Sequence, residues 1–250
     1  MSAAAENGTA AAARRLAVVT GGTRGIGRAC AERLAREGYA VVAAARSEPR
    51  EALPPGVAFA ALDVAEPAAV RRLFDDLAAR FGAVHVFVAA AGTAGADPPE
   101  EGLAEAHWRA VLGSNLDGAW RCAMAASRIM PDGEGRIVTI ASVLGLRAVP
   151  DQIAYTAAKH GVLGLTRALA LRLAPRRITV NALCPGWVAT DMAAARWREL
   201  GMDAAAAAAT TPTGRITTAE EVAAAMAWLV SPEAGNVTGQ AIALDGGASL

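Results

Sequence analysis

The stretch VVTGGTRGIGRA, residues 18–29, decides the fold. An apolar run ends at Thr20, glycines occupy four of the next seven positions, and a segment with helical spacing begins near Gly25. A strand, a glycine-rich turn and a helix in this order are typical of the first β–α unit of an open α/β sheet.

Apolar runs of strand length alternate with longer amphipathic segments along the rest of the chain. We predict strands at residues 15–20, 40–45, 57–62, 84–90, 136–142, 177–184 and 240–245. We predict helices at residues 25–37, 67–81, 103–130, 152–174 and 219–230, the third of them bent near Gly113 and Gly118. Apolar strands separated by helices indicate a parallel sheet covered on both faces. The sequence therefore predicts an α/β fold, a doubly wound parallel sheet of the Rossmann type.

The chain shows no linker-like boundary after its first residues, so we predict a single domain over residues 14–250. Residues 1–13 have the composition of a disordered tail. Residues 188–216 are predicted to form a substrate lid, irregular apart from a helix at the alanine run 204–209.

Composition excludes several classes of function. A hydrophobic content of 54% is globular, and a formal net charge of +0 gives no electrostatic basis for binding nucleic acid or an anionic membrane. Three separated cysteines without a C-x-x-C pair argue against a disulfide framework and a zinc site, and the histidines form no cluster with metal spacing. No apolar run is long enough for a membrane span. We expect a cytoplasmic protein without a metal.

The glycine-rich turn has the chemistry of a phosphate-binding loop. Gly21 permits a sharp exit from the strand, and Gly25 and Gly27 let the backbone approach a pyrophosphate. The helix N-terminus that follows supplies N–H donors for the negative charge. A tight β–α turn without a ligand is the alternative interpretation of this stretch alone.

Several motifs in the expected order make the chain resemble the short-chain dehydrogenase/reductase family. They are the T-G-x-x-x-G-x-G turn, Ser142, the Y-x-x-x-K sequence at Tyr155 and Lys159, and the C-P-G segment at residues 184–186. The resemblance implies catalysis by Asn115, Ser142, Tyr155 and Lys159. It also implies cofactor contacts from Gly21, Thr23, Arg24, Gly25, Ile26, Gly27, Arg46, Asp63, Val64, Ala91, Gly92, Tyr155, Lys159, Pro185, Gly186, Val188 and Thr190.

The catalytic residues suit the reduction of a carbonyl. A carbonyl that accepts hydride needs a proton, which the phenol of Tyr155 supplies. Lys159 is four residues further along the same helix face, where its charge is expected to lower the pKa of Tyr155. Ser142 is expected to donate a hydrogen bond to the carbonyl oxygen, and Asn115, by resemblance, to support a water relay to the lysine.

The residues after the second predicted strand favour NADPH over NADH. Family members that use NAD usually carry an acidic residue there, whereas this chain has Ala45 and then Arg46. A guanidinium can bind a 2′-phosphate, and Arg24 in the glycine loop offers a second one. One departure from the family is Ala89-Ala90-Ala91-Gly92, where Asn-Asn-Ala-Gly is usual.

Residues 157–192 are similar to bacterial β-ketoacyl reductases and to ketoreductases of aromatic polyketide pathways. We therefore predict NADPH-dependent reduction of a ketone by a homotetramer or homodimer, with acyl-carrier protein or coenzyme A as a candidate carrier of the substrate. Two alternatives stay open: an NAD-dependent secondary-alcohol dehydrogenase similar to hydroxybutyrate dehydrogenases, and a dinucleotide sensor without turnover.

Two sets of side chains are candidates for contacts with a carrier protein, a second subunit or the substrate. A basic patch could receive an acidic carrier protein, or could consist of solvated helix ends; its members are Arg128, Arg172, Arg176 and Arg177. We place Trp108, Trp120 and Trp228 in the core or in subunit contacts, and Trp187 and Trp197 at the lid, facing substrate.

Overall fold

The computed structural model describes residues 15–250, so the tail predicted for residues 1–13 lies outside the described part. Seven strands form one parallel sheet in the order β3-β2-β1-β4-β5-β6-β7. The strands are β1 Leu16–Thr20, β2 Ala40–Ala45, β3 Val57–Ala61, β4 Val86–Ala89, β5 Arg136–Ile140, β6 Thr179–Pro185 and β7 Ala241–Leu244. The prediction of a doubly wound Rossmann-type sheet is confirmed.

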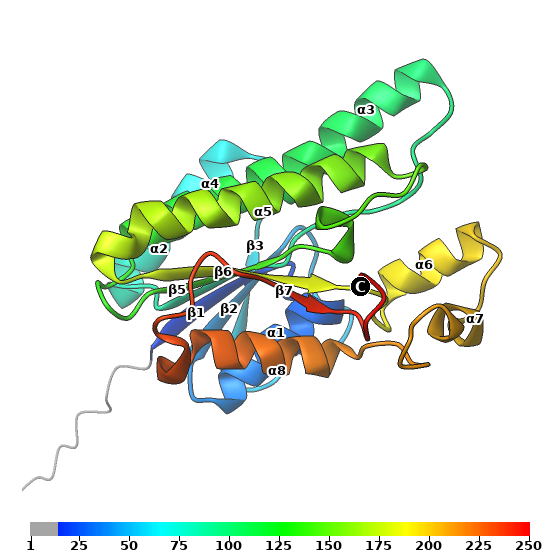
Figure 1. Ribbon diagram of the computed structural model, residues 1–250. Helices are drawn as coiled ribbons and strands as arrows, with labels where there is room; N and C mark the ends of the chain where they lie inside the picture. The colour runs from blue at the N-terminus through cyan, green and yellow to red at the C-terminus, as the bar shows by residue number, and fades with distance from the viewer. Residues whose placement is uncertain (1–14) are drawn as a thin grey trace, which may run out of the picture.

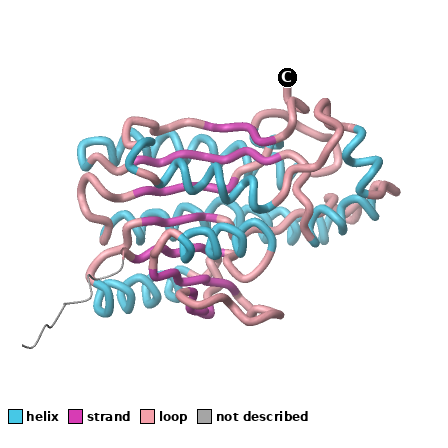
Figure 2. Tube along the Cα trace, turned by 90° about the horizontal axis from the view of Figure 1, so that it is seen from below, coloured by secondary structure: helices cyan, strands magenta, loops and turns pink. Residues whose placement is uncertain are grey.

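Helices cover both faces of the sheet (Figure 1). They are α1 Gly25–Arg36, α2 Pro67–Phe81, α3 Glu101–Leu112, α4 Gly118–Arg128, α5 Ile153–Leu173, α6 Asp191–Glu199, α7 Ala204–Ala209 and α8 Ala219–Val230. Helices α2, α4 and α5 lie on one face, and α1 and α8 on the other. Figure 2 looks onto the sheet and shows the strands side by side.

Alternate residues of each strand supply the two cores. In β1, Val18 faces the layer of α2, α4 and α5, while Val19 faces α1 and α8. In β4, Phe87 packs edge-on against Phe74 of α2, with ring centroids 6.1 Å apart. Burial on both faces explains why the strands are apolar throughout. Because all strands run parallel, their carboxyl ends lie at one edge of the sheet.

The long third helix bends where the glycines predicted it. A π-helical turn, Gly113–Asp117, separates α3 from α4. A Cβ at Gly118 would lie 2.5 Å from Cγ2 of Val64, so only glycine lets this turn approach the end of β3. Because π-turns re-aim side chains, this bend determines where Asn115 points.

The lid is more helical than predicted, because α6 as well as α7 forms within residues 188–216. Thr190 caps α6 and Asp203 caps α7 through their side chains. Trp187 and Trp197 pack edge to face, with centroids 5.9 Å apart. Trp197 is only 8% exposed, so it anchors the lid rather than lining a substrate surface.

Three other tryptophans do not belong to the core. Trp108, Trp120 and Trp228 are 38%, 50% and 48% exposed, which leaves subunit contact as the prediction for them. They lie on the outer sides of α3, α4 and α8, which face solvent. All three cysteines are buried and free. Within residues 15–250 no helix combines the length and apolarity needed to cross a bilayer.

Candidate active site

The glycine loop closes through backbone contacts that tolerate no side chain. Gly21 has a φ of 69°, and a Cβ there would lie 2.8 Å from the carbonyl oxygen of Ala90. A Cβ at Gly27 would lie 2.2 Å from the carbonyl oxygen of Gly21. Strand β1, helix α1 and the end of β4 therefore meet through the main chain.

The start of α1 fits a phosphate group. Its N-cap residue, Arg24, makes no side-chain cap, and its first turn has no acidic residue. The first N–H groups of the helix therefore have no side-chain cap and point toward the end of the sheet where anions are favoured. Thr23 is partly buried in the loop, and Ile26 packs against the core between the sheet and helices α1 and α8. Across the loop, Thr190 lies 3.3 Å from the Cβ position of Gly25.

The end of β4 is held without the usual asparagine amides. The amide of Ala91 donates to Oγ1 of Thr20 at 3.4 Å, and the amide of Ala90 to the carbonyl of Thr20 at 3.2 Å. The departure from the family at Ala89-Ala90 is thus met by Thr20 and the main chain. Gly92 lies beside Asn115, whose Oδ1 is 3.0 Å from the Cβ position of that glycine.

The residues predicted to bind the adenosine half lie at the ends of β1, β2 and β3. Arg24 and Arg46 are exposed, and within residues 15–250 neither forms an ion pair. Asp63 accepts a hydrogen bond from the amide of Ala65 at 2.9 Å. Val64 is buried in the core. The two guanidinium groups are therefore available to an added anion at this edge.

The segment after β6 passes close to the C-terminal strand. Gly186 lies against Asp245, whose Cβ is 2.9 Å from the Cβ position of the glycine. Pro185 and Val188 are buried, and Thr190 begins α6. The four predicted residues of this segment thus lie at the carboxyl edge of the sheet, where the glycine loop also lies.

Ser142, Tyr155 and Lys159 meet at the carboxyl end of β5. Ser142 follows that strand, and its Oγ accepts a hydrogen bond from the amide of Leu144 at 3.1 Å. Nζ of Lys159 donates to the carbonyl of Ile140 at 2.8 Å and lies 5.4 Å from the centroid of the Tyr155 ring. Lys159 is 6% exposed and Ser142 is 9% exposed. The structure brings the three side chains together at this end of the sheet.

The pKa directions differ from the prediction for the tyrosine. Burial raises the pKa of Tyr155 to about 12, and the hydroxyl of Ser142 acts in the opposite direction. Burial lowers the pKa of Lys159 to about 8. The pKa of Tyr155 is therefore raised and not lowered as expected, because removal from water disfavours the phenolate.

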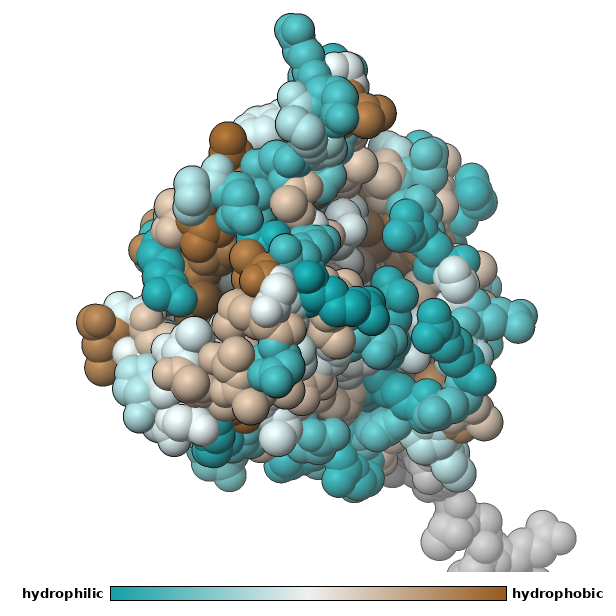
Figure 3. Space-filling view, turned by 90° about the vertical axis from the view of Figure 1, so that its right-hand side faces the viewer, coloured by the Kyte–Doolittle hydropathy of each residue, from teal (hydrophilic) through white to brown (hydrophobic). Residues whose placement is uncertain are grey.

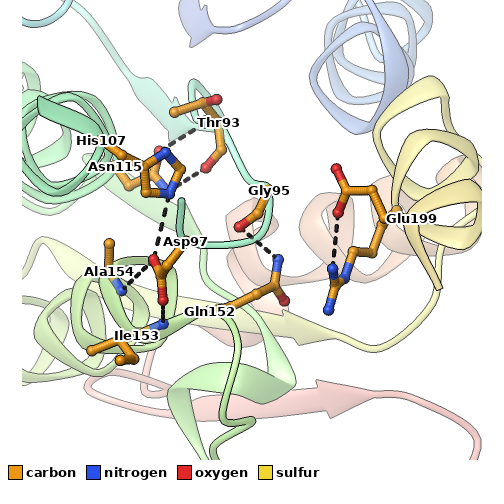
Figure 4. A network of polar contacts seen from close by, with 10 residues as sticks. Thr93, Gly95, Asp97, His107, Asn115, Gln152, Ile153, Ala154 and Glu199 are labelled. Carbon is orange, nitrogen blue, oxygen red and sulfur yellow. Dashed lines mark hydrogen bonds and ion pairs between the residues drawn. The ribbon is translucent and has the colours of Figure 1, made fainter. Parts of the chain in front are cut away.

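Asn115 holds a loop. Its Oδ1 accepts a hydrogen bond from the amide of Thr93, and its Nδ2 donates to the carbonyl of Thr93, both at 2.8 Å (Figure 4). This pair fixes the chain just after Gly92. These two bonds use one N–H group and the oxygen of the Asn115 side chain, which is 2% exposed. The water relay implied for Asn115 stays a prediction.

Sequence reasoning missed the other end of this loop. Residues 93–97, here called the bridging loop, run from Asn115 to the start of α5 (Figure 4). Nε2 of Gln152 donates to the carbonyl of Gly95 at 3.2 Å, and the amide of Asp97 donates to the carbonyl of Asp151 at 3.0 Å. Asp97 lies 56 residues before the start of α5, so no local sequence pattern predicts that the two meet.

The family model described as Enoyl-(Acyl carrier protein) reductase matches residues 21–249. The chain belongs to the short-chain dehydrogenase/reductase family. It is 37% identical to the 3-oxoacyl-(acyl-carrier-protein) reductase FabG of Escherichia coli (strain K12) over 240 residues, covering 93% of this chain and 96% of the relative. It is 38% identical to the short-chain reductase protein NovJ of Streptomyces niveus, covering 93% of each chain.

A solved structure of an actinorhodin polyketide ketoreductase variant with NADPH has a TM-score of 0.83 and 34% identity, covering 94% of this chain and 97% of that one. These relatives make the chain an oxidoreductase acting on CH–OH or C=O groups, with a nicotinamide dinucleotide as cofactor. Among residues 15–250 no group of three His, Cys, Asp or Glu side chains could hold a metal ion.

Within a single chain, the predicted basic patch is distant from the site that contains Tyr155. Arg172 is 17 residues beyond Tyr155 on α5, or about 25 Å along the helix. Arg128 pairs with Asp75 at 3.2 Å, and Arg176 with Asp132 at 2.7 Å. Arg176 also donates to the carbonyls of Ser127 and Met130, so it holds the end of α4.

Proposed function

We propose that the protein reduces a ketone to a secondary alcohol with NADPH. The observation that carries the proposal is the meeting of Tyr155, Ser142 and Lys159 at the edge of the sheet that also holds the uncapped start of α1. A phosphate-binding helix end and a proton donor at one edge suit hydride transfer coupled to protonation.

Each side chain then has a defined task. The nicotinamide supplies a hydride when bound. Tyr155 gives its phenolic proton to the developing alkoxide, and its raised pKa of about 12 keeps it in the proton-carrying form that reduction requires. Ser142 donates a hydrogen bond to the carbonyl oxygen as charge develops there. Lys159, in its charged form, favours the phenolate that is left behind.

The preference for NADPH rests on Arg24 and Arg46. Both are exposed at the ends of β1 and β2, and Ala45 leaves no carboxylate that would repel a 2′-phosphate. Two guanidinium groups favour a phosphate ester over a free hydroxyl by charge-assisted hydrogen bonds. The relatives include an NADPH-containing structure, which supports the same choice.

For the substrate we propose a β-ketoacyl or polyketide-type chain, presented on acyl-carrier protein or coenzyme A. The names of the relatives and the exposed apolar side chains Met192 and Leu200 of the lid support an apolar chain. Polar and apolar side chains are mixed over the end of the molecule that carries the lid (Figure 3). We also propose a homotetramer or homodimer, in which Trp120 and Trp228 become buried.

The test follows consumption of NADPH, with NADH in parallel, against an acetoacetyl thioester and a bicyclic decalone. We expect turnover with NADPH, and a loss of about 10²–10⁴-fold in kcat in Tyr155→Phe with unchanged nucleotide affinity, because only the proton donor is removed. Arg46→Ala is expected to lower kcat/KM for NADPH about tenfold and leave that for NADH unchanged.

The matched control is Arg80→Ala, an exposed arginine on α2 far from the nucleotide. A wild-type preference for NADH would overturn the nucleotide assignment and favour an alcohol dehydrogenase similar to hydroxybutyrate dehydrogenases. Binding of both nucleotides without turnover of any ketone or alcohol would favour the sensor.

A further inference from the structure

Helix α5 begins without a cap of its own. Its N-cap residue, Gln152, makes no side-chain cap, and the first turn has no acidic residue. The amide group of Gln152 is directed to the carbonyl of Gly95 instead. The first N–H groups of a helix of 21 residues, which carry the positive end of its dipole, therefore need a partner from elsewhere in the fold.

Asp97 of the bridging loop provides that partner. The amide of Ile153 donates to Oδ2 of Asp97, and the amide of Ala154 donates to Oδ1 at 3.3 Å (Figure 4). Both carboxylate oxygens are thus used on the first two amides of α5. The side chain of Asp97 is 20% exposed and has one further neighbour, Nε2 of His107 at 3.5 Å. A carboxylate at a helix N-terminus is the arrangement that the dipole favours.

The capped turn carries the proton donor. Tyr155 is the third residue of α5, directly after the two amides that Asp97 binds. A helix end without caps frays within its first turn, so Tyr155 is the catalytic side chain most exposed to such motion. Lys159 lies one turn deeper and is held separately by the carbonyl of Ile140.

The bridging loop is itself fixed at its other end. Asn115 grips Thr93 with two hydrogen bonds of 2.8 Å, and Gly95 and Asp97 bind the start of α5. The π-turn and the first turn of α5 are therefore connected through five residues of chain. Asn115 and the turn that carries Tyr155 are thus linked by hydrogen bonds through the bridging loop.

We propose that Asp97 is a positioning residue, which caps α5 from the bridging loop and thereby fixes the place of Tyr155. The expected change in kcat rests on the proposed function. The expected change in the position of Tyr155 rests on the hydrogen bonds alone. Asp97 does not contact the reacting atoms in this assignment and acts through the helix.

The kinetic test compares Asp97→Ala and Asp97→Asn with Glu105→Gln, an exposed carboxylate on α3. We expect kcat to fall about tenfold or more in Asp97→Ala, because displacement of a reacting group by about 1 Å costs up to 10²-fold. Asp97→Asn, which can still accept one amide, should lose less, and KM for NADPH should change less than about twofold. Wild-type kcat in both variants would overturn the proposal.

A second readout needs no substrate. The chain has two tyrosines, so 3-fluorotyrosine in a Tyr39→Phe background gives one ¹⁹F resonance, from Tyr155. We expect Asp97→Ala, but not Glu105→Gln, to shift or broaden it and to speed amide exchange at residues 153–155. An unchanged resonance and unchanged exchange would overturn the proposal even if the wild type turned over no ketone, an outcome that would separately defeat the proposed function. If Asp97→Ala fails to fold, Asp97→Asn is judged by the same resonance.

Discussion

The glycine loop and the first turn of α5 lie at the same edge of the sheet, but they are held in different ways. The glycine loop is fixed by main-chain contacts, such as the approach of Gly27 to the carbonyl of Gly21. The turn that carries Tyr155 is fixed by side chains, chiefly those of Asp97 and Gln152. The first arrangement is specified within a dozen residues, whereas the second joins segments about 56 residues apart.

This difference explains why the contacts that hold the glycine loop are recognisable in the sequence, whereas those that hold the first turn of α5 are not. A loop that needs glycine at fixed spacings leaves a local pattern, since no other residue fits. A helix capped by a distant carboxylate leaves none, because any loop that reaches the helix end can supply the group. The comparison yields three predictions.

The largest effect is expected for Gly27→Ala. The new Cβ would lie 2.2 Å from the carbonyl oxygen of Gly21, so the loop must open. Overpacking of this kind costs about 1–3 kcal/mol, which corresponds to as much as about 100-fold in the Kd for NADPH. Isothermal titration measures the Kd, and thermal unfolding the stability.

Gly164→Ala is the matched control for that change. Gly164 lies on the exposed side of α5, and a Cβ there meets nothing within 4 Å. Replacement of a helix-interior glycine by alanine is expected to stabilise the fold by about 0.5–1 kcal/mol and to leave nucleotide binding unchanged. Equal behaviour of the two variants would contradict the account of the loop.

A buried ionisable group distinguishes the half of the site around α5, and its effect on stability should be comparable to that of Gly27→Ala. Burial lowers the pKa of Lys159 from 10.5 to about 8. Between these two values the folded chain has released the proton and the unfolded chain still holds it, so this group makes the free energy of unfolding rise with pH. The rise amounts to about 3 kcal/mol, and below pH 8 the stabilisation is absent.

Lys159→Met removes this dependence. We expect the variant to be more stable than the wild type at pH 7 and to lose most of that advantage by pH 10, as measured by urea unfolding at a series of pH values. Subtracting the stability curve of the variant from that of the wild type, each plotted against pH, removes the contribution of the other titrating groups. A wild type that is more stable than Lys159→Met at pH 7 would show that the charged lysine is well solvated or paired.

The smallest effect is expected for Thr20→Val, which removes a side chain from the half of the site held by the main chain. The hydroxyl of Thr20 makes two long hydrogen bonds of 3.4 Å, to Val88 and Ala91. We expect a loss of about 1 kcal/mol in stability and a change of less than about threefold in the Kd for NADPH. Loss of nucleotide binding in this variant would mean that a side chain, not the main chain, holds the loop.

Much of the architecture could be predicted, because apolar strands and helical spacing are local properties. The bend in the third helix was predicted at Gly113 and Gly118 for the same reason. Element ends were less well predicted: the fourth strand pairs only over Val86–Ala89, not over residues 84–90, since pairing depends on its neighbours. Helix α6 was missed because its burial depends on Trp187 and Trp197 packing together.

The sequence by itself determined the alternation of strands and helices, the glycine loop, and the four residue types Asn115, Ser142, Tyr155 and Lys159 in family order. Only the tertiary structure decided the direction of the Tyr155 pKa, because desolvation depends on what surrounds the phenol. Only it brought Asp97 to the start of α5. Residue spacing encodes contacts along one helix or turn, whereas burial and caps supplied from a distance arise when separate segments pack.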